Sequence, residues 1–195
     1  MSKKVLLFGT NNAHKLREIQ EMVGAIFAIM SLRDLGIDID VEETEATLEG
    51  NALLKARSFF ERTGLPCFAD DTGLEVEALG GAPGVYTARY AGDHCSPADN
   101  IQKMLREMKG QKHRRARFRT VIAFFDGGQS RFFEGEVWGN IARAASGEGG
   151  FGYDPIFQPE GYDKTFASFS PEEKHAISHR GIAVRRFADF LKASY

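Results

Sequence analysis

The fold is decided by Val5-Leu6-Leu7-Phe8-Gly9-Thr10-Asn11-Asn12, a stretch close to the start of the 195-residue chain. Four consecutive apolar residues predict a buried strand, and the glycine and polar residues after them predict a tight turn. Leu16, Ile19 and Val23 then recur at the spacing of one helix face. A strand that leads through a turn into a helix predicts an α/β domain.

Similar signals continue along the chain. Thr47 precedes a helical segment that Gly64 closes, and Cys67-Phe68-Ala69 predicts a short buried strand. That strand is expected to end at Asp70-Asp71-Thr72-Gly73, before a half-exposed strand over residues 74–79. Further expected elements are a helix opened by Ser96-Pro97, a hairpin over residues 118–125 and 131–137, a glycine-rich loop over residues 146–155, and two helices after Ser170. No repeat or linker interrupts this order, so residues 1–195 are predicted to form a single domain.

The composition excludes several classes of function. The chain has 25 basic and 27 acidic residues, and its formal charge of −2 creates no general attraction for nucleic acid or anionic membranes. The two cysteines, Cys67 and Cys95, have no metal-binding or disulfide pattern, which is typical of a reducing compartment. No apolar stretch reaches the roughly 20 residues that a membrane span needs. These features predict a soluble, cytoplasmic protein in which any anion is held by a local site.

The turn after the first strand is the first candidate for such a site. Thr10, Asn11, Asn12, Ala13, His14 and Lys15 join the strand to a helix N-terminus. Free backbone N–H groups and the positive end of the helix dipole favour a phosphate there, and Lys15 would add a full charge. The alternative is an ordinary helix cap with a solvated lysine. A Walker A motif is absent.

Acidic residues form the second candidate site. Asp70 and Asp71 follow an apolar strand, where carboxylates are costly unless a cation or N–H donors accompany them. Glu42 and Glu43 offer further hard oxygen ligands ahead of the helix that carries Asn51 and Lys55 on one face. Magnesium typically takes one or two protein carboxylates, with water and substrate phosphates as its other ligands. The alternative is a capped turn and a solvated acidic pair.

Two further segments are weaker signals. Lys174, His179 and Arg180 are usually solvated on a helix, and the basic run from Lys112 to Arg119 more often marks a solvated turn than a nucleic-acid site.

Taken together, the chain resembles the inosine triphosphate pyrophosphatase family, also called the Ham1-like pyrophosphatases. The resemblance covers nearly the whole chain and depends on motifs in the family's order. The motifs are Thr10 to Lys15, Ala69-Asp70-Asp71-Thr72-Gly73-Leu74, Gly80 to Tyr90, Gly150-Phe151-Gly152-Tyr153-Asp154-Pro155 and Ser178-His179-Arg180-Gly181.

The resemblance implies a role for each motif. Thr10 to Lys15 would bind the triphosphate, Asp71 would be the general base and a magnesium ligand, and Thr72 would contact the substrate. Either Glu42 or Glu43 would reach the metal. The implied base-binding residues are Phe151, Gly152, Tyr153, Asp154, Lys174, His179 and Arg180, with Phe151 or Tyr153 available for stacking.

The family's fold implies an elongated mixed β-sheet with flanking helices and a nucleotide-binding cleft between two lobes, in a homodimer. Its activity implies Mg²⁺-dependent hydrolysis of ITP, dITP or XTP to the monophosphate and pyrophosphate. Two alternatives stay open: a Maf-like pyrophosphatase acting on other nucleotides, and a nucleotide- or RNA-binding module without turnover. Asp70 and Asp71 disfavour the second, because carboxylates repel phosphates unless a metal intervenes.

Overall fold

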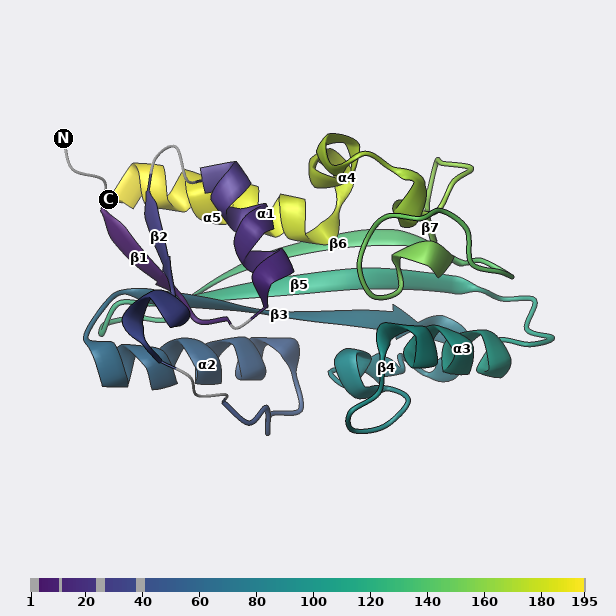
Figure 1. Ribbon diagram of the computed structural model, residues 1–195, viewed down its shortest axis with the longest axis horizontal. Helices are drawn as coiled ribbons and strands as arrows, with labels where there is room; N and C mark the ends of the chain where they lie inside the picture. The colour runs from purple at the N-terminus through teal and green to yellow at the C-terminus, as the bar shows by residue number, and fades with distance from the viewer. Residues whose placement is uncertain (1–3, 11, 24–26, 38–40, 195) are drawn as a thin grey trace. The chain divides into compact units, whose positions relative to one another are not determined.

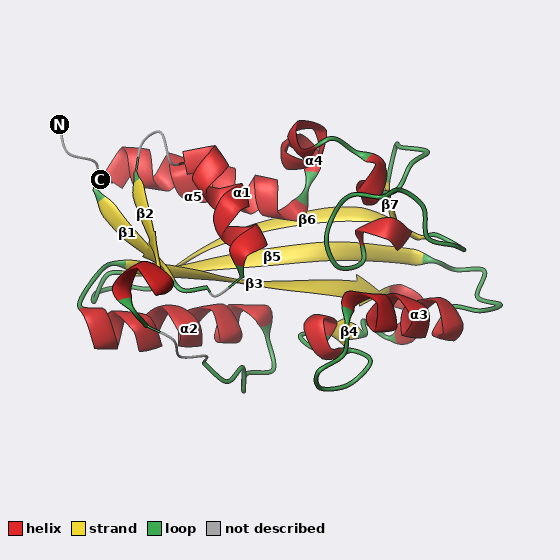
Figure 2. Cartoon of the chain, viewed as in Figure 1, coloured by secondary structure: helices red, strands yellow, loops and turns green. Residues whose placement is uncertain are grey.

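The computed structural model describes residues 4–10, 12–23, 27–37 and 41–194. Among these residues, seven strands form one mixed sheet in the order β2-β1-β3-β5-β6-β7, and β4 pairs with β3 (Figure 2). The strands are β1 (Val5–Phe8), β2 (Ala28–Ser31), β3 (Cys67–Val76), β4 (Pro83–Gly84), β5 (Arg115–Phe125), β6 (Arg131–Ile141) and β7 (Phe157–Pro159). β1 is parallel to both β2 and β3, which is the usual arrangement when a helix connects neighbouring strands. β4 and β7 are antiparallel to their neighbours β3 and β6.

The helices begin where the sequence supplies caps. They are α1 (Ala13–Val23), α2 (Leu48–Thr63), α3 (Pro97–Glu107), α4 (Pro171–Ile177) and α5 (His179–Ser194). The Thr47 side chain accepts the Gly50 N–H at the start of α2. Ser96 and Ser170 form full capping boxes at α3 and α4, so the predicted helix starts are confirmed. No helix within the described residues is long and apolar enough to cross a membrane.

The chain divides into two compact units, which are described separately. The first unit contains residues 1–71, 120–135 and 182–195, and the second contains residues 72–119 and 136–181. Three strands, β3, β5 and β6, contribute residues to both units.

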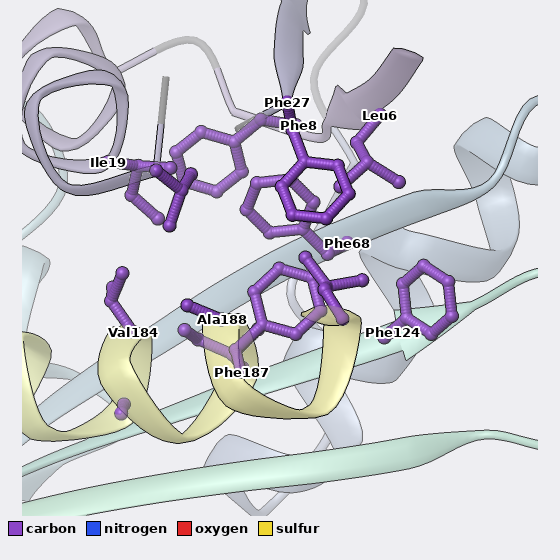
Figure 3. Packing of buried hydrophobic residues seen from close by; sticks show 13 residues of the cluster. Leu6, Phe8, Ile19, Phe27, Phe68, Phe124, Val184, Phe187 and Ala188 are labelled. Carbon is purple, nitrogen blue, oxygen red and sulfur yellow. The ribbon is translucent and has the colours of Figure 1, made fainter. Parts of the chain in front are cut away.

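In the first unit, helices pack on both faces of the sheet (Figure 1). One core includes Leu6, Phe8 and Phe68 together with residues of α1 and α5. Figure 3 shows this core, in which Phe68 stacks on Phe8 with ring centroids 4.6 Å apart and contacts Phe187 of α5. Leu7, between Leu6 and Phe8, packs instead with α2. Because side chains alternate along a strand, the even-numbered residues of β1 and of the first part of β3 point toward α1 and α5, and the odd-numbered residues point toward α2.

In the second unit, the same alternation separates a core from a charged surface. Phe118 of β5 joins Leu74 and Val76 of β3 in a core that includes Met104 and Met108, on and just after α3. The intervening strand residues carry charges, and they pair with one another across the sheet. The pairs include Arg117 with Glu75 and Glu136, and Arg119 with Glu75.

One predicted boundary is wrong. Asp70, Asp71 and Thr72 do not terminate a short strand, because β3 runs without interruption from Cys67 to Val76. The strand continues because Lys15, Lys55 and Asn51 of other elements contact the two carboxylates, so no turn is needed to supply N–H donors. The strand expected over residues 74–79 is also shorter, because residues 77–79 form a 3₁₀ turn.

Candidate active site

Asp71 is the centre of a cluster of charged and polar side chains in the first unit. Lys55 of α2 lies with its Nζ 2.5 Å from Glu43 Oε1 and 3.7 Å from Asp71 Oδ1. Asn51, one turn earlier in α2, is fully buried and donates from Nδ2 to Asp71 Oδ2 at 3.3 Å. Because residues four apart share a helix face, α2 presents both donors to the same carboxylate.

Lys55 and Asn51 were not among the predicted site residues, although the sequence placed them on one face of the helix. The structure brings Glu43 into the cluster, whereas Glu42 is exposed.

Burial and charge alter the protonation of this cluster. Burial raises the pKa of Asp71; Lys55 and Lys15 oppose this effect, and Glu43 and Asp70 reinforce it. Burial alone would lower the pKa of Lys55, but the carboxylates of Asp71, Glu43 and Asp70 outweigh it and raise that pKa. Lys55 therefore stays charged at neutral pH, and Asp71 accepts a proton more readily than an exposed aspartate does.

Asp70 has a different environment from Asp71, although the two residues are adjacent. Lys15 of α1 lies with its Nζ 2.9 Å from Asp70 Oδ2, and the Asp70 side chain is only 1% exposed. Neighbouring residues of a strand point to opposite faces, so Asp70 is directed toward α1 and Asp71 toward α2. The nearest ammonium group therefore differs between the two acids, being that of Lys15 for Asp70 and that of Lys55 for Asp71.

The donor set suits a divalent cation. Glu43 and Asp71 already share one cation, the Lys55 ammonium. The three carboxylates of Glu43, Asp70 and Asp71 face two ammonium groups, those of Lys15 and Lys55, which leaves one excess negative charge when all are ionised. Within the described ranges, no group of three or more Asp, Glu, His or Cys side chains is arranged so that it could hold a metal ion by itself.

The turn before α1 is capped by its own side chains. Thr10 Oγ1 accepts the Asn12 N–H at 3.1 Å, and Asn12 Oδ1 accepts the Lys15 N–H at 3.3 Å. Ala13 and His14 begin α1. Asn11, also predicted to bind phosphate, lies outside the described residues. Lys15 is 16% exposed and paired with Asp70, so it is not the solvated lysine of the alternative interpretation.

The second unit contains the predicted base-binding residues. Asp154 is buried, and its Oδ2 accepts the Phe151 N–H at 2.5 Å and the Lys174 ammonium at 2.6 Å. Gly150 has φ +88°, and a Cβ there would lie 2.5 Å from the Asp154 carboxylate. The structure therefore brings Asp154, Lys174 and the glycine-rich loop together.

The two aromatic residues of this loop differ in exposure. Phe151 is 42% exposed, whereas Tyr153 is 3% exposed and donates its hydroxyl to the Thr87 carbonyl at 3.0 Å. Gly152, with φ +62°, reverses the chain between them. Tyr153 is therefore too buried to receive a base, and of the two aromatic residues Phe151 is the exposed one.

His179 and Arg180 lie at the start of α5 and are both buried. The imidazole of His179 stacks on Phe118 with centroids 4.6 Å apart, and Arg180 Nη2 lies 3.5 Å from Thr72 Oγ1. Gly181 follows, where an added Cβ would lie 2.0 Å from the His175 carbonyl oxygen. The glycine therefore permits the close approach of α4 and α5 that sets the position of Arg180.

The arginines in the basic run of residues 112–119 all make hydrogen bonds or ion pairs within the protein. Arg114 donates to the carbonyls of Met108, Ile141 and Ala142, and Arg117 donates to Glu75 and Glu136. A surface hollow of about 380 Å³ adjoins this run and is lined by Glu75, Glu77, Gly80, Gly81, Arg117 and Trp138, none of which is a predicted site residue. Because carboxylates accompany these arginines, the surface does not offer phosphates a continuous positive strip.

Comparison with known proteins identifies the family. The model of the Ham1 family matches residues 6–190. A protein from Porphyromonas gingivalis named dITP/XTP pyrophosphatase is 51% identical over 187 residues, covering 95% of this chain and 96% of that protein. The solved Ham1 protein of Staphylococcus aureus superposes with a TM-score of 0.91 at 39% identity, and that of Coxiella burnetii with 0.92 at 37%; each covers 98% of this chain and 100% of the other. The chain belongs to the Ham1 family.

Proposed function

We propose that this protein hydrolyses the non-canonical purine nucleotides ITP, dITP and XTP to the monophosphate and pyrophosphate. The observation that carries the proposal is its similarity, over nearly the full length, to proteins named dITP/XTP pyrophosphatase. The Asp71 cluster supplies the chemistry that such a reaction needs, namely a proton acceptor and cations beside it.

In the proposed reaction, water attacks the α-phosphorus and pyrophosphate leaves. Asp71 orients this water and takes its proton, which its raised pKa favours, while Asn51 fixes the orientation of the carboxylate. The N-terminal end of α1 and the lysines Lys15 and Lys55 hold the phosphates, since ammonium groups form strong contacts with phosphate oxygens.

Glu43 and Asp71 are the residues that would hold Mg²⁺. When bound, the ion neutralises charge on phosphate oxygens. The phosphates would then compete with Asp70 for Lys15 and with Glu43 for Lys55, because one ammonium cannot fully satisfy both.

Base selection is assigned to residues of the second unit. Phe151 stacks on the purine, a contact worth about 1–3 kcal/mol for any base and therefore unselective. Lys174 and Arg180 are pure donors, so they favour the 6-keto oxygen of hypoxanthine and xanthine over the 6-amino group of adenine. A mismatch of this kind can reach factors of about 10⁴.

The same family relation underlies a further expectation, that the protein is a cytoplasmic homodimer that binds neither nucleic acid nor membranes. Light scattering during gel filtration would test the dimer.

The decisive experiment measures pyrophosphate release from ITP, XTP, GTP and ATP, with Mg²⁺ and with EDTA. ITP and XTP should be hydrolysed far faster than ATP, and EDTA should abolish the activity. Release of orthophosphate instead of pyrophosphate, or equal rates for ITP and ATP, would contradict the proposal. Preference for a modified pyrimidine nucleotide would favour a Maf-like activity.

A further inference from the structure

Thr87 occupies a junction in the second unit, within the sequence motif of residues 80–90 that the proposed reaction leaves unexplained. Its hydroxyl accepts the Leu74 N–H of β3 at 2.8 Å and donates to the Gly84 carbonyl at 2.6 Å. Leu74 also pairs with Gly84 in the β3–β4 ladder. The Thr87 hydroxyl therefore links its own turn to β3, two residues after Thr72.

A second element holds the same turn. Asn100 of α3 is 4% exposed and donates from Nδ2 to the Ala88 carbonyl at 3.0 Å. Its Oδ1 accepts the Ala91 N–H at 2.7 Å. Because β3 and α3 both bind the turn, its backbone carbonyls are held in fixed directions.

One of those carbonyls is bound by the glycine-rich loop. The Thr87 carbonyl accepts the buried Tyr153 hydroxyl at 3.0 Å. Tyr153 is followed by Asp154, which binds both the Phe151 N–H and the Lys174 ammonium. An unbroken series of contacts thus runs from β3 through Thr87 to the residues assigned to the purine.

We propose that Thr87 is a positioning residue for purine selection, which fixes the Phe151–Asp154 segment relative to β3 through Tyr153. This inference rests on the proposed function and extends it to a residue that does not touch the substrate. Loss of the Thr87 hydroxyl would leave the Leu74 N–H without its acceptor and let the turn shift. Small displacements of groups that orient a substrate are costly, so selectivity should fall before folding does.

The test compares Thr87→Val, which removes the hydroxyl at nearly constant volume, with Thr87→Ser, which retains it. Thr63→Val is the matched control, because the Thr63 hydroxyl likewise donates to a carbonyl, that of Phe59 at 2.8 Å, and accepts an N–H, that of Leu65 at 3.2 Å. Thr63 ends α2 and has no assigned role in binding.

The first measurement is kcat/KM for ITP and ATP. Thr87→Val should lower the value for ITP about 10-fold and that for ATP less than about 3-fold, whereas Thr87→Ser and Thr63→Val should retain the wild-type ratio. Tyr153→Phe should reproduce the effect, and adding Thr87→Val to it should cost little more, because both changes break one connection. An unchanged ratio in Thr87→Val, or effects of the two changes that multiply, would overturn the proposal.

The second measurement does not depend on activity. Hydrogen exchange of a peptide covering residues 149–157 should quicken at least several-fold in Thr87→Val and not in Thr63→Val. Unchanged exchange would overturn the positioning role even if the wild-type protein hydrolyses ITP. A different result would contradict the proposed function itself. In that case the wild-type protein would release no pyrophosphate from ITP, while Thr87→Val would still quicken hydrogen exchange.

Discussion

Replacing Lys55 by methionine tests how strongly the Asp71 cluster depends on its central ammonium. Methionine has a similar length and helix propensity, so the change removes the charge and little else. The Lys55 side chain is 12% exposed and lies against Glu43 and Asp71, which are 24% and 9% exposed. Removing one partner of a buried ion pair usually costs about 3–5 kcal/mol, and because Lys55 and Glu43 are partly exposed we expect a loss near the lower end of this range at pH 8.

The cost should depend on pH. Lys55 is the largest influence that opposes the raised pKa of Asp71, so its removal raises that pKa further. The unfolded carboxyl has a pKa of about 3.9, and its pKa in the folded protein is higher. The protonated carboxyl therefore stabilises the folded protein fully below the unfolded pKa, and this stabilisation is lost as the pH rises through the folded pKa. The destabilisation caused by Lys55→Met should therefore be smaller at pH 5 than at pH 8.

Urea denaturation in EDTA at both pH values would measure this dependence. Lys192→Met is the matched control, because the Lys192 side chain is 53% exposed in its pair with Asp189. That change should cost less than about 1 kcal/mol at either pH. The reasoning fails if Lys55→Met costs no more than Lys192→Met, or if its cost is greater at pH 5.

Two further substitutions and one thiol-labelling experiment test residues of the two units. Asp71→Asn should lower kcat for ITP by about 10² or more while the circular dichroism spectrum is retained, since the amide cannot take a proton; near-normal turnover would remove Asp71 as the base. Arg180→Ala should reduce the rate with ITP far more than that with ATP; equal losses would assign Arg180 to the phosphates or the fold. Burial raises the pKa of Cys67 to about 12, so a thiol reagent at pH 8 should modify Cys95 in the native protein and Cys67 only after denaturation; two thiols reacting rapidly without denaturant would contradict this.

The features predictable from the sequence are those with local causes. Ser96 and Ser170 form caps with residues three positions later, so the helices that they begin could be placed from a few neighbouring residues. Strand β1 and helix α1 were likewise predictable from an unbroken apolar run and helical spacing. The fold class followed from the order of these elements and from the resemblance.

The features that were missed depend on distant partners. Asp70 and Asp71 look like a turn in isolation, but Lys15 and Lys55 allow both to remain in a strand. Each lysine comes from a different helix, and nothing in the local sequence of β3 indicates them. The same limitation applies to Tyr153, whose hydroxyl partner is 66 residues away, so the sequence could not distinguish it from Phe151 as a stacking residue.

The alternation of side chains along β3 has a consequence for insertions and deletions. Deleting one residue between Phe68 and Asp70 would shift the register of the later strand residues by one position, so an acid now directed toward α2 would be directed toward α1. Lys15 would then meet the carboxylate of Asp71, and Lys55 would meet the Thr72 hydroxyl in place of an acid, although every charged residue would still be present. In this part of the chain, sequence length is therefore constrained as tightly as residue identity, and homologues should differ here by substitution and not by insertion or deletion.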